Sequence, residues 1–356
     1  MSAAITIYAG PTALKAIRKD GLSAEQVKVI AGAAGGPKWF TLYGLDQYLF
    51  GEFFPQKKEI LQTIGASAGA WRMACLGQQH PLAAIDRLAK LYAEETYSEK
   101  PDDHEVTLKA KIMLDKVLGE NGVNDIINNP KIHTHIITDR CKGFLTSDNT
   151  KIQMLGLAAS AFLNLFSRKS MQLFFDRVIF HSPLEQQGFF ELDTFPTTNV
   201  MLTESNLKQA LIASGSIPVV LEGIKDIPGA PKGVYRDGGI TDYHFDFPFL
   251  KSDGLVLYPH FSRILCPGWF DKHAPWRKIT PENYHNVVLI VPSEQHVANL
   301  PYGKITDRTD FKNLEDKPRI KYFKTVQSES QRLGEDFKNL VETGKGIDKI
   351  LPLFPE

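Results

Sequence analysis

Two glycine-rich turns, each directly after a short apolar segment, constrain the fold of this chain more than any other feature. Val27–Ala31 is typical of a buried strand and runs into the sequence GAAGG, and Ile60–Ile64 runs into GASAG. A helical pattern follows each turn, because Pro37 suits the first position of a helix and Ala70–Leu76 is rich in small residues. Repeated strand–turn–helix units predict a mostly parallel sheet covered by helices, so we expect a three-layer α/β/α sandwich.

The charge balance and the cysteines narrow the classes of function. The 356 residues include 41 Lys and Arg against 41 Asp and Glu, so the net charge is zero and no overall field attracts nucleic acid. Cys75, Cys141 and Cys266 lie too far apart for a CxxC site or a disulfide framework, which suits a reducing compartment. We recognise no secretory signal and no apolar run of about 18 residues, and therefore expect a cytoplasmic protein.

The second turn carries a candidate nucleophile. Residues 65–69 form a GxSxG pattern with Ser67 at its centre. A serine on a sharp strand-to-helix turn has a strained backbone that tolerates only small neighbours, which explains Gly65 and Gly69. The turn lifts the hydroxyl above the sheet, beside the positively polarised N-terminus of the next helix. The alternative is a tight structural turn without chemistry.

The first turn is a candidate for stabilising an oxyanion. Its candidate donors are the backbone N–H groups of Gly35, Gly36 and Lys38, because Pro37 has none. A phosphate-binding loop is a competing interpretation, although the chain lacks the GK[ST] of a Walker motif and matches a dinucleotide GxGxxG only in part. A plain glycine turn for close helix packing is the third interpretation.

A third motif, Asp237-Gly238-Gly239, follows a short strand predicted at Gly233–Arg236. An acidic residue before two glycines can lie at a turn with its carboxylate exposed to a site. However, Asp-Gly is also a very common turn sequence, so this motif alone does not distinguish catalysis from a plain turn.

Taken together and in this order, the three motifs resemble those of the patatin-like phospholipases, a family of lipid acyl hydrolases. The family's Gly-Gly-Gly-x-Arg/Lys oxyanion loop matches Ala34–Lys38. Its GxSxG nucleophile falls on Ser67, and its catalytic aspartate, in a DGG motif, falls on Asp237. The stretch Ala213–Pro218 also resembles the small-residue segment that the family has before DGG.

The resemblance implies a mechanism and a domain organisation. Ser67 would attack an ester carbonyl while Asp237 accepts the hydroxyl proton and returns it to the leaving alcohol, without a metal, a nucleotide or another cofactor. The motifs span about residues 27–248, so we expect one patatin-like domain over 1–356, with 249–356 as an extension packed on it. The implied partner is a lipid or acyl-ester substrate, with transient contact to a membrane surface as an option.

The chain departs from the family pattern at three places. Ala34 replaces the first oxyanion glycine, and Trp39 stands where the family prefers a small residue. After DGG the family often has Asn-Pro, whereas this chain has the aromatic-rich Tyr243–Pro248. These departures affect the fit of a substrate more than the dyad, so the substrate need not be a common phospholipid.

Other functions stay open on the sequence. An α/β-hydrolase triad in the order Ser, Asp, His would combine Ser67 and Asp237 with a downstream histidine. The histidines that fit this order are His260, His244, His273, His285 and His296. A catalytically silent lipid- or acyl-binding protein on the same scaffold is the non-enzyme alternative, and nucleotide binding at residues 32–38 is a third.

Three further segments carry expectations. His133 and His135 share one face of a predicted strand, but no acidic or cysteine partner has metal-ligand spacing, so we expect no metal site. A helix is predicted at Lys151–Phe166, and its segment Met154–Phe166 is the most apolar of the chain. Because this segment is apolar nearly all round, a buried core helix is favoured over a lipid-contacting or interfacial one. The apolar spacing of Arg319–Val341 predicts one helix, ended by Gly344.

Overall fold

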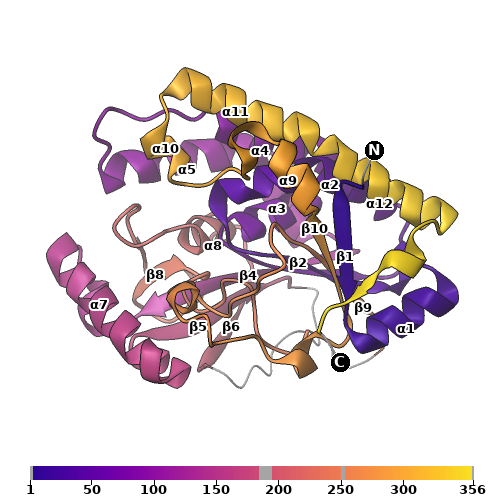
Figure 1. Cartoon of the computed structure of the whole chain (residues 1–356). Helices are drawn as coiled ribbons and strands as arrows, with labels where there is room; N and C mark the ends of the chain where they lie inside the picture. The colour runs from indigo at the N-terminus through magenta and orange to yellow at the C-terminus, as the bar shows by residue number, and fades with distance from the viewer. Residues whose placement is uncertain (1–2, 184–194, 250–252, 355–356) are drawn as a thin grey trace.

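The computed structural model describes residues 3–183, 195–249 and 253–354, which form an α/β structure around one large mixed sheet (Figure 1). The strand order is β11-β1-β10-β9-β2-β3-β4-β5-β6, with β8 paired to β4 and β7 paired to β8. The strands are β1 (Ile5–Ala9), β2 (Val27–Gly32), β3 (Leu61–Ala66), β4 (Ile132–Cys141), β5 (Phe175–His181), β6 (Thr197–Met201), β7 (Ile224–Lys225), β8 (Val234–Asp237), β9 (Leu255–Pro259), β10 (Val287–Pro292) and β11 (Leu351–Pro352).

The helices differ in length from one to four or five turns, and most of the long ones lie on one side of the sheet (Figure 1). They are α1 (Pro11–Asp20), α2 (Tyr43–Tyr48), α3 (Ala68–Leu76), α4 (Pro81–Glu94), α5 (Asp103–Leu118), α6 (Gly122–Ile127), α7 (Thr150–Phe166), α8 (Leu207–Ser214), α9 (Glu294–Asn299), α10 (Asp310–Asn313), α11 (Asp316–Glu329) and α12 (Gln331–Thr343). Within the described residues, each helix is too short or too polar to cross a membrane.

The sheet is mixed, although most of its strand pairs are parallel, including those at its centre and the outer pairs β5–β6 and β1–β11. The neighbours β10, β9, β2, β3 and β4 run parallel, whereas β1 is antiparallel to β10, and β5 and β8 are antiparallel to β4. The chain reverses after β4 because α7, which joins β4 to β5, packs against the short turns Gly143–Thr146, Arg168–Leu173 and Trp269–His273 instead of crossing a face of the sheet.

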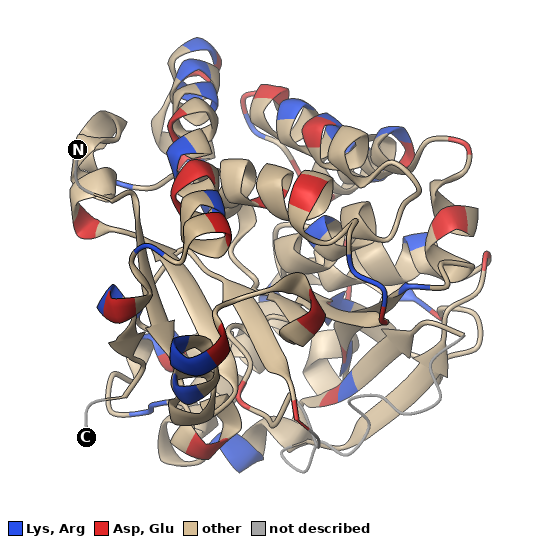
Figure 2. Cartoon of the chain, turned by 90° about the vertical axis from the view of Figure 1, so that its right-hand side faces the viewer, with Lys and Arg blue, Asp and Glu red and all other residues tan. Residues whose placement is uncertain are grey.

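The two faces of the sheet are covered differently. One face carries a core with α2, α3, α4, α11 and α12, in which aromatic rings such as Phe40 and Phe323 pack at 5.2 Å between centroids. The opposite face is covered largely by the chain after β8, where Phe245, Phe249 and Tyr284 are buried over the strands. Charged residues of both signs are mixed along the outer helices (Figure 2), in keeping with the zero net charge.

The C-terminal third contributes to the sheet itself. Strand β9 lies between β10 and β2, next to the strand that leads into the first glycine-rich turn. The single helix predicted over Arg319–Val341 is wrong, since α11 and α12 are separate and meet at Ser330. Ser330 Oγ accepts the Gly44 N–H at 2.8 Å, so the helix breaks where it packs on α2. Gly344 ends α12 in the left-handed region, with φ 69°, as predicted.

The expectation that the helical segment Met154–Phe166 is buried is wrong. The large apolar side chains of α7 face outward, and Phe162 and Phe166 are 60% and 74% exposed. The side chains that face the protein include Gln153 and Asn164. Because nearly every position of this helix is apolar, its composition did not reveal that the few polar positions form the inner side.

Candidate active site

Strands β3 and β8 point toward each other along the same edge of β4. β3 is parallel to β4 and ends with Ala66 opposite Ile137, while β8 is antiparallel to β4 and ends with Asp237 opposite Thr138. Strand β5 pairs with β4 alongside both of these positions, so β3 and β8 share the remaining edge. The residue after β3 therefore meets the end of β8, which brings together two residues that lie 170 positions apart in the chain.

Ser67 occupies the sharp turn between β3 and α3. Its backbone angles are φ 55° and ψ −130°, in a region that residues other than glycine seldom adopt. The Ser67 N–H donates to Ser214 Oγ at 2.9 Å, and Ser214 Oγ in turn donates to the Ile137 carbonyl at 2.7 Å. The strained turn and its buried support are the geometry expected of a nucleophile elbow.

The carboxylate of Asp237 accepts a hydrogen bond from Ser67. The Ser67 Oγ to Asp237 Oδ2 distance is 2.7 Å, and the Gly239 N–H donates to Asp237 Oδ1 at 2.7 Å. Both Ser67 and Asp237 are only 6% exposed. Burial raises the pKa of Asp237 to about 6, against the lowering effect of the bonds from Ser67 and Gly239. The pair thus combines an oriented hydroxyl with a carboxylate that is more basic than a free one.

The loop after β2 faces the same place. The Ala34 N–H donates to the Tyr243 carbonyl at 3.1 Å, which fixes the loop to the chain that follows DGG. The Lys38 N–H donates to the Gly35 carbonyl at 3.3 Å, so this amide is engaged within the turn. In the described part of the chain, the Gly35 and Gly36 N–H groups donate no hydrogen bond. Of the three amides predicted as oxyanion donors, these two are available.

The glycines of the motifs lie at close backbone approaches. A Cβ on Gly65 would lie 2.6 Å from Ala70, and one on Gly238 would lie 2.3 Å from the Ile137 carbonyl oxygen. A Cβ on Gly239 would lie 2.7 Å from the side chain of Ala34, so the DGG turn packs against the first glycine-rich loop.

A buried ionic network holds the chain after DGG. Arg177 forms a bidentate pair with Asp242 at 2.6 and 2.7 Å, with both side chains fully buried. Thr241 donates its N–H and its hydroxyl to Asp139 at 3.0 and 2.7 Å. Burial and the nearby charge of Asp242 raise the pKa of Asp139 well above its usual value. The network anchors the residues just after Asp237 to β4 and β5.

Ser67 and Asp237 open into a cavity of about 150 Å³. Its other walls include Ile217 and Pro218, from the small-residue stretch before DGG, and residues that no motif indicated: Tyr92, Trp269, Lys272, Asp307, Arg308 and Thr309. Several of them come from the C-terminal third, where the sequence shows no motif. Bulky or basic residues in loops gave no signal of their own, because only the folded chain brings them to the dyad.

Positive charge prevails on the cavity wall. Lys38, Lys272 and Arg308 line it together with the acidic Asp237 and Asp307. Lys38 Nζ lies 3.5 Å from Asp307, and Lys272 Nζ lies 3.6 Å from the centre of the Tyr243 ring. Burial and, after it, repulsion by Lys38 lower the pKa of Lys272 to about 8. At neutral pH the cavity therefore offers cations close to the serine.

The candidate histidines for a triad lie elsewhere. No histidine is among the described residues that line the cavity. His260 is fully buried against His244 and Phe261, and burial lowers its pKa to about 3. His133 and His135 are buried on β4, and the described residues contain no group of three or more His, Cys, Asp or Glu able to hold a metal ion.

Comparisons with known proteins add little. No protein-family model matches the chain, and no curated protein does. The crystal structure of VipD from Legionella pneumophila is similar with a TM-score of 0.33 and 13% identity, over 72% of this chain and 53% of VipD. The chain thus spans about half the length of VipD. A TM-score at this level does not establish a shared fold, so no property of VipD is transferred to this chain.

Proposed function

We propose that this protein is a serine acyl hydrolase of the patatin-like type, which cleaves lipid or other acyl esters with Ser67 and Asp237. The observation that carries the proposal is the 2.7 Å hydrogen bond from Ser67 Oγ to Asp237 Oδ2 in a cavity. The strained backbone of Ser67 supports it, because strain of this kind persists where the surrounding structure enforces it and is concentrated at functional sites.

In the proposed reaction, Asp237 Oδ2 takes the proton of Ser67 Oγ as this oxygen attacks the ester carbonyl carbon. The N–H groups of Gly35 and Gly36 donate to the oxyanion of the tetrahedral intermediate, each with an effect of about 3 kcal/mol in comparable enzymes. Asp237 then gives its proton to the leaving alcohol, and an acyl-enzyme forms on Ser67. A water molecule, deprotonated by Asp237, releases the acid by the reverse sequence.

The size and the charge of the cavity indicate which esters it can accept. A volume of about 150 Å³ is smaller than that of most small-molecule sites, and suits the reacting end of an acyl ester rather than a whole lipid. Lys38, Lys272 and Arg308 favour an ester that carries negative charge near the scissile bond. The aromatic side chains of Tyr92 and Trp269, with Ile217, Pro218 and Ile240, provide apolar parts of the wall.

The direct dyad is preferred to the triad because a carboxylate, and not an imidazole, contacts Ser67 Oγ. In a triad the histidine would have to lie between the serine and the aspartate. A silent acyl-binding protein would keep the cavity without turnover, and the following experiment separates it from an enzyme.

The test is hydrolysis of 4-nitrophenyl esters of short and medium chain length by the wild type, Ser67→Ala and Asp237→Asn. We expect turnover by the wild type and a loss of about 10³-fold or more in each variant. Ser216→Ala serves as a control, because Ser216 is buried near the dyad and its hydroxyl donates to the Ile212 carbonyl. If the folded wild type shows no turnover, the hydrolase is refuted and the silent acyl-binding protein is the remaining interpretation. Turnover that survives Asp237→Asn would contradict the dyad.

A further inference from the structure

Helix α7 has the reverse polarity of a normal surface helix. The side chains that face the protein are small or polar, namely Gln153, Gly156, Ser160 and Asn164. The exposed side chains are large and apolar, namely Ile152, Met154, Leu155, Phe162, Leu165 and Phe166. A surface helix of a monomeric protein places its apolar stripe inward, so an outward stripe indicates an interaction surface.

The exposed stripe continues beyond the helix. The Phe162 and Phe166 rings contact each other edge to face, with centroids 5.2 Å apart. Phe144 and Leu173 are 62% and 67% exposed, and they belong to the two short turns that pack against α7. We call these exposed side chains, with those of α7 just named, the α7 face. In Figure 1, α7 stands at the edge of the fold, at the lower left.

Helix α7 and the turn after it carry only positive charges, whereas the exposed Asp148, between Phe144 and the helix, pairs with Lys225 at 2.7 Å. Lys151 and Lys169 are exposed at the two ends of the α7 face, and the chain has no acidic residue from Asn149 to Phe175. Exposed cations that flank an apolar helical face are the pattern of helices that lie in the interface of an anionic membrane. A protein partner would need acidic groups and an apolar groove that match the α7 face in position and shape. An anionic lipid surface needs no such match, because its headgroups are negatively charged and its acyl chains accept apolar side chains of any arrangement.

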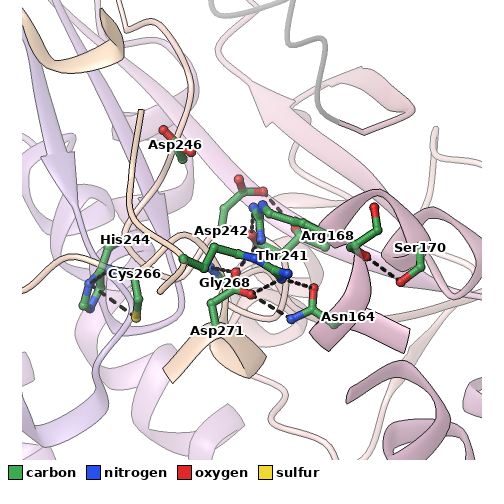
Figure 3. A network of polar contacts seen from close by, with 12 residues as sticks. Asn164, Arg168, Ser170, Thr241, Asp242, His244, Asp246, Cys266, Gly268 and Asp271 are labelled. Carbon is green, nitrogen blue, oxygen red and sulfur yellow. Dashed lines mark hydrogen bonds and ion pairs between the residues drawn. The ribbon is translucent and has the colours of Figure 1, made fainter. Parts of the chain in front are cut away.

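The inner side of α7 is joined to the walls of the cavity. Gln153 Oε1 accepts the Val219 N–H at 2.8 Å, next to Pro218 in the wall. Asn164 and Arg168 donate to the Asp271 carboxylate at 2.7 and 3.0 Å, and Asp271 lies between Trp269 and Lys272 (Figure 3).

A second contact reaches the chain after DGG. Arg168 Nη2 donates to the Thr241 carbonyl at 2.6 Å, four residues after Asp237 (Figure 3). Asp271 also accepts the Gly268 N–H at 2.9 Å and a bond from Arg277 at 2.8 Å. Helix α7 and the turn after it are thus hydrogen-bonded to the segments that surround the dyad.

We propose that the α7 face binds the surface of an anionic lipid bilayer, with the helix lying in the headgroup region and its apolar side chains in the acyl boundary. This inference rests on the proposed function, because membrane binding would hold the cavity next to a lipid ester. Lys151 and Lys169 attract the anionic headgroups, and Leu155, Phe162 and Phe166 insert.

The test is co-sedimentation with vesicles of phosphatidylcholine alone or with about one quarter phosphatidylglycerol. All variants carry Ser67→Ala, so binding is measured without turnover. We expect binding to the phosphatidylglycerol vesicles and a weakening of at least about 10-fold in Phe162→Ser/Phe166→Ser. We expect a similar weakening in Lys151→Gln/Lys169→Gln, which high salt reproduces in the parent.

The control is Ile60→Ser, which removes an apolar side chain that is 48% exposed at the other end of β3. It should bind vesicles like the parent, and thermal melting should show that every variant is folded. Equal binding by the phenylalanine variant and the parent, or no binding by the parent, would overturn the proposal. The proposal would also be overturned if the parent does not bind vesicles but forms a dimer, and if the phenylalanine substitutions dissociate that dimer. If the wild type, with Ser67 intact, shows no ester turnover while the Ser67→Ala parent binds vesicles, the hydrolase is refuted and the membrane-binding surface stands.

Discussion

Gly69, in the first turn of α3, lies directly against Gly32 at the end of β2. A Cβ on Gly69 would lie 1.8 Å from the Gly32 carbonyl oxygen. The contact joins the two glycine-rich turns, since Gly69 closes the motif of Ser67 and Gly32 begins the loop that carries Gly35 and Gly36. The distance between Ser67 and the Gly35 and Gly36 N–H groups is therefore fixed by direct contact between the two backbones.

Replacement of Gly69 should disturb both stability and activity. Gly69→Ala forces the two turns apart, and we expect a loss of about 2–3 kcal/mol in the free energy of unfolding. Ester turnover should fall more than the folded fraction does, because the amides move away from the oxyanion. Gly215→Ala is the matched control, as its nearest neighbour would be 3.6 Å away. The measurements are the free energy of unfolding from denaturant titration and kcat/KM. If Gly69→Ala equals this control in both, the account is refuted.

The activity should depend on the ionisation of Asp237. The base must be deprotonated to accept the Ser67 proton, and burial raises its pKa to about 6. We therefore expect kcat/KM for a neutral ester to rise with pH through an apparent pKa of about 6 and to level off above it. An inflection near about 4, the value of an exposed aspartate, would contradict the buried dyad.

Asp237 should lower the stability of the folded protein at neutral pH. Its folded pKa of about 6 lies above the unfolded value, so the folded state holds the proton more tightly. This favours folding fully at low pH, and the advantage is lost as pH rises through about 4 to 6. Asp237→Asn should therefore be more stable than the wild type above pH 6 by up to about 3 kcal/mol, and the difference should shrink below pH 4. Urea unfolding at several pH values measures it, and a destabilised Asp237→Asn at neutral pH would be the contrary result.

Lys272 should influence which esters are cleaved. Lys272→Met removes a cation from the wall, so kcat/KM for a negatively charged ester should fall about 10-fold while that for a neutral ester of equal size changes little. The preference for the charged ester should also weaken in the wild type above about pH 8, where Lys272 loses its proton. Lys321→Met, on the exposed side of α11, serves as the control. An equal loss for both esters would indicate a purely structural lysine.

The sequence indicated the dyad more readily than the cavity. Ser67 directly follows β3 and Asp237 is the last residue of β8, each in a short local motif, and local strand–turn patterns depend on neighbours in the chain. Lys272 and Arg308 reach the cavity from long connections without a motif, and their position depends on the packing of the C-terminal third. The fold-level likeness to patatins stays a prediction.

Two errors in the helices have a common physical cause. Periodicity shows that α7 is helical but not which side faces the protein, and here Gln153 and Asn164 face inward because Val219 and Asp271 pair with them. Similarly, the apolar spacing continues across Ser330, where the break between α11 and α12 follows from contact with Gly44. In both cases the deciding contact lies far away in the sequence.

The central claim is that Ser67 is a nucleophile activated by Asp237. Its most direct measurement is the intact mass of the protein after treatment with a fluorophosphonate, followed by peptide mapping. The account predicts one adduct, on Ser67, with labelling that is abolished in Ser67→Ala and strongly slowed in Asp237→Asn. No adduct on the folded wild type, or an adduct on another serine that persists in Ser67→Ala, would contradict it.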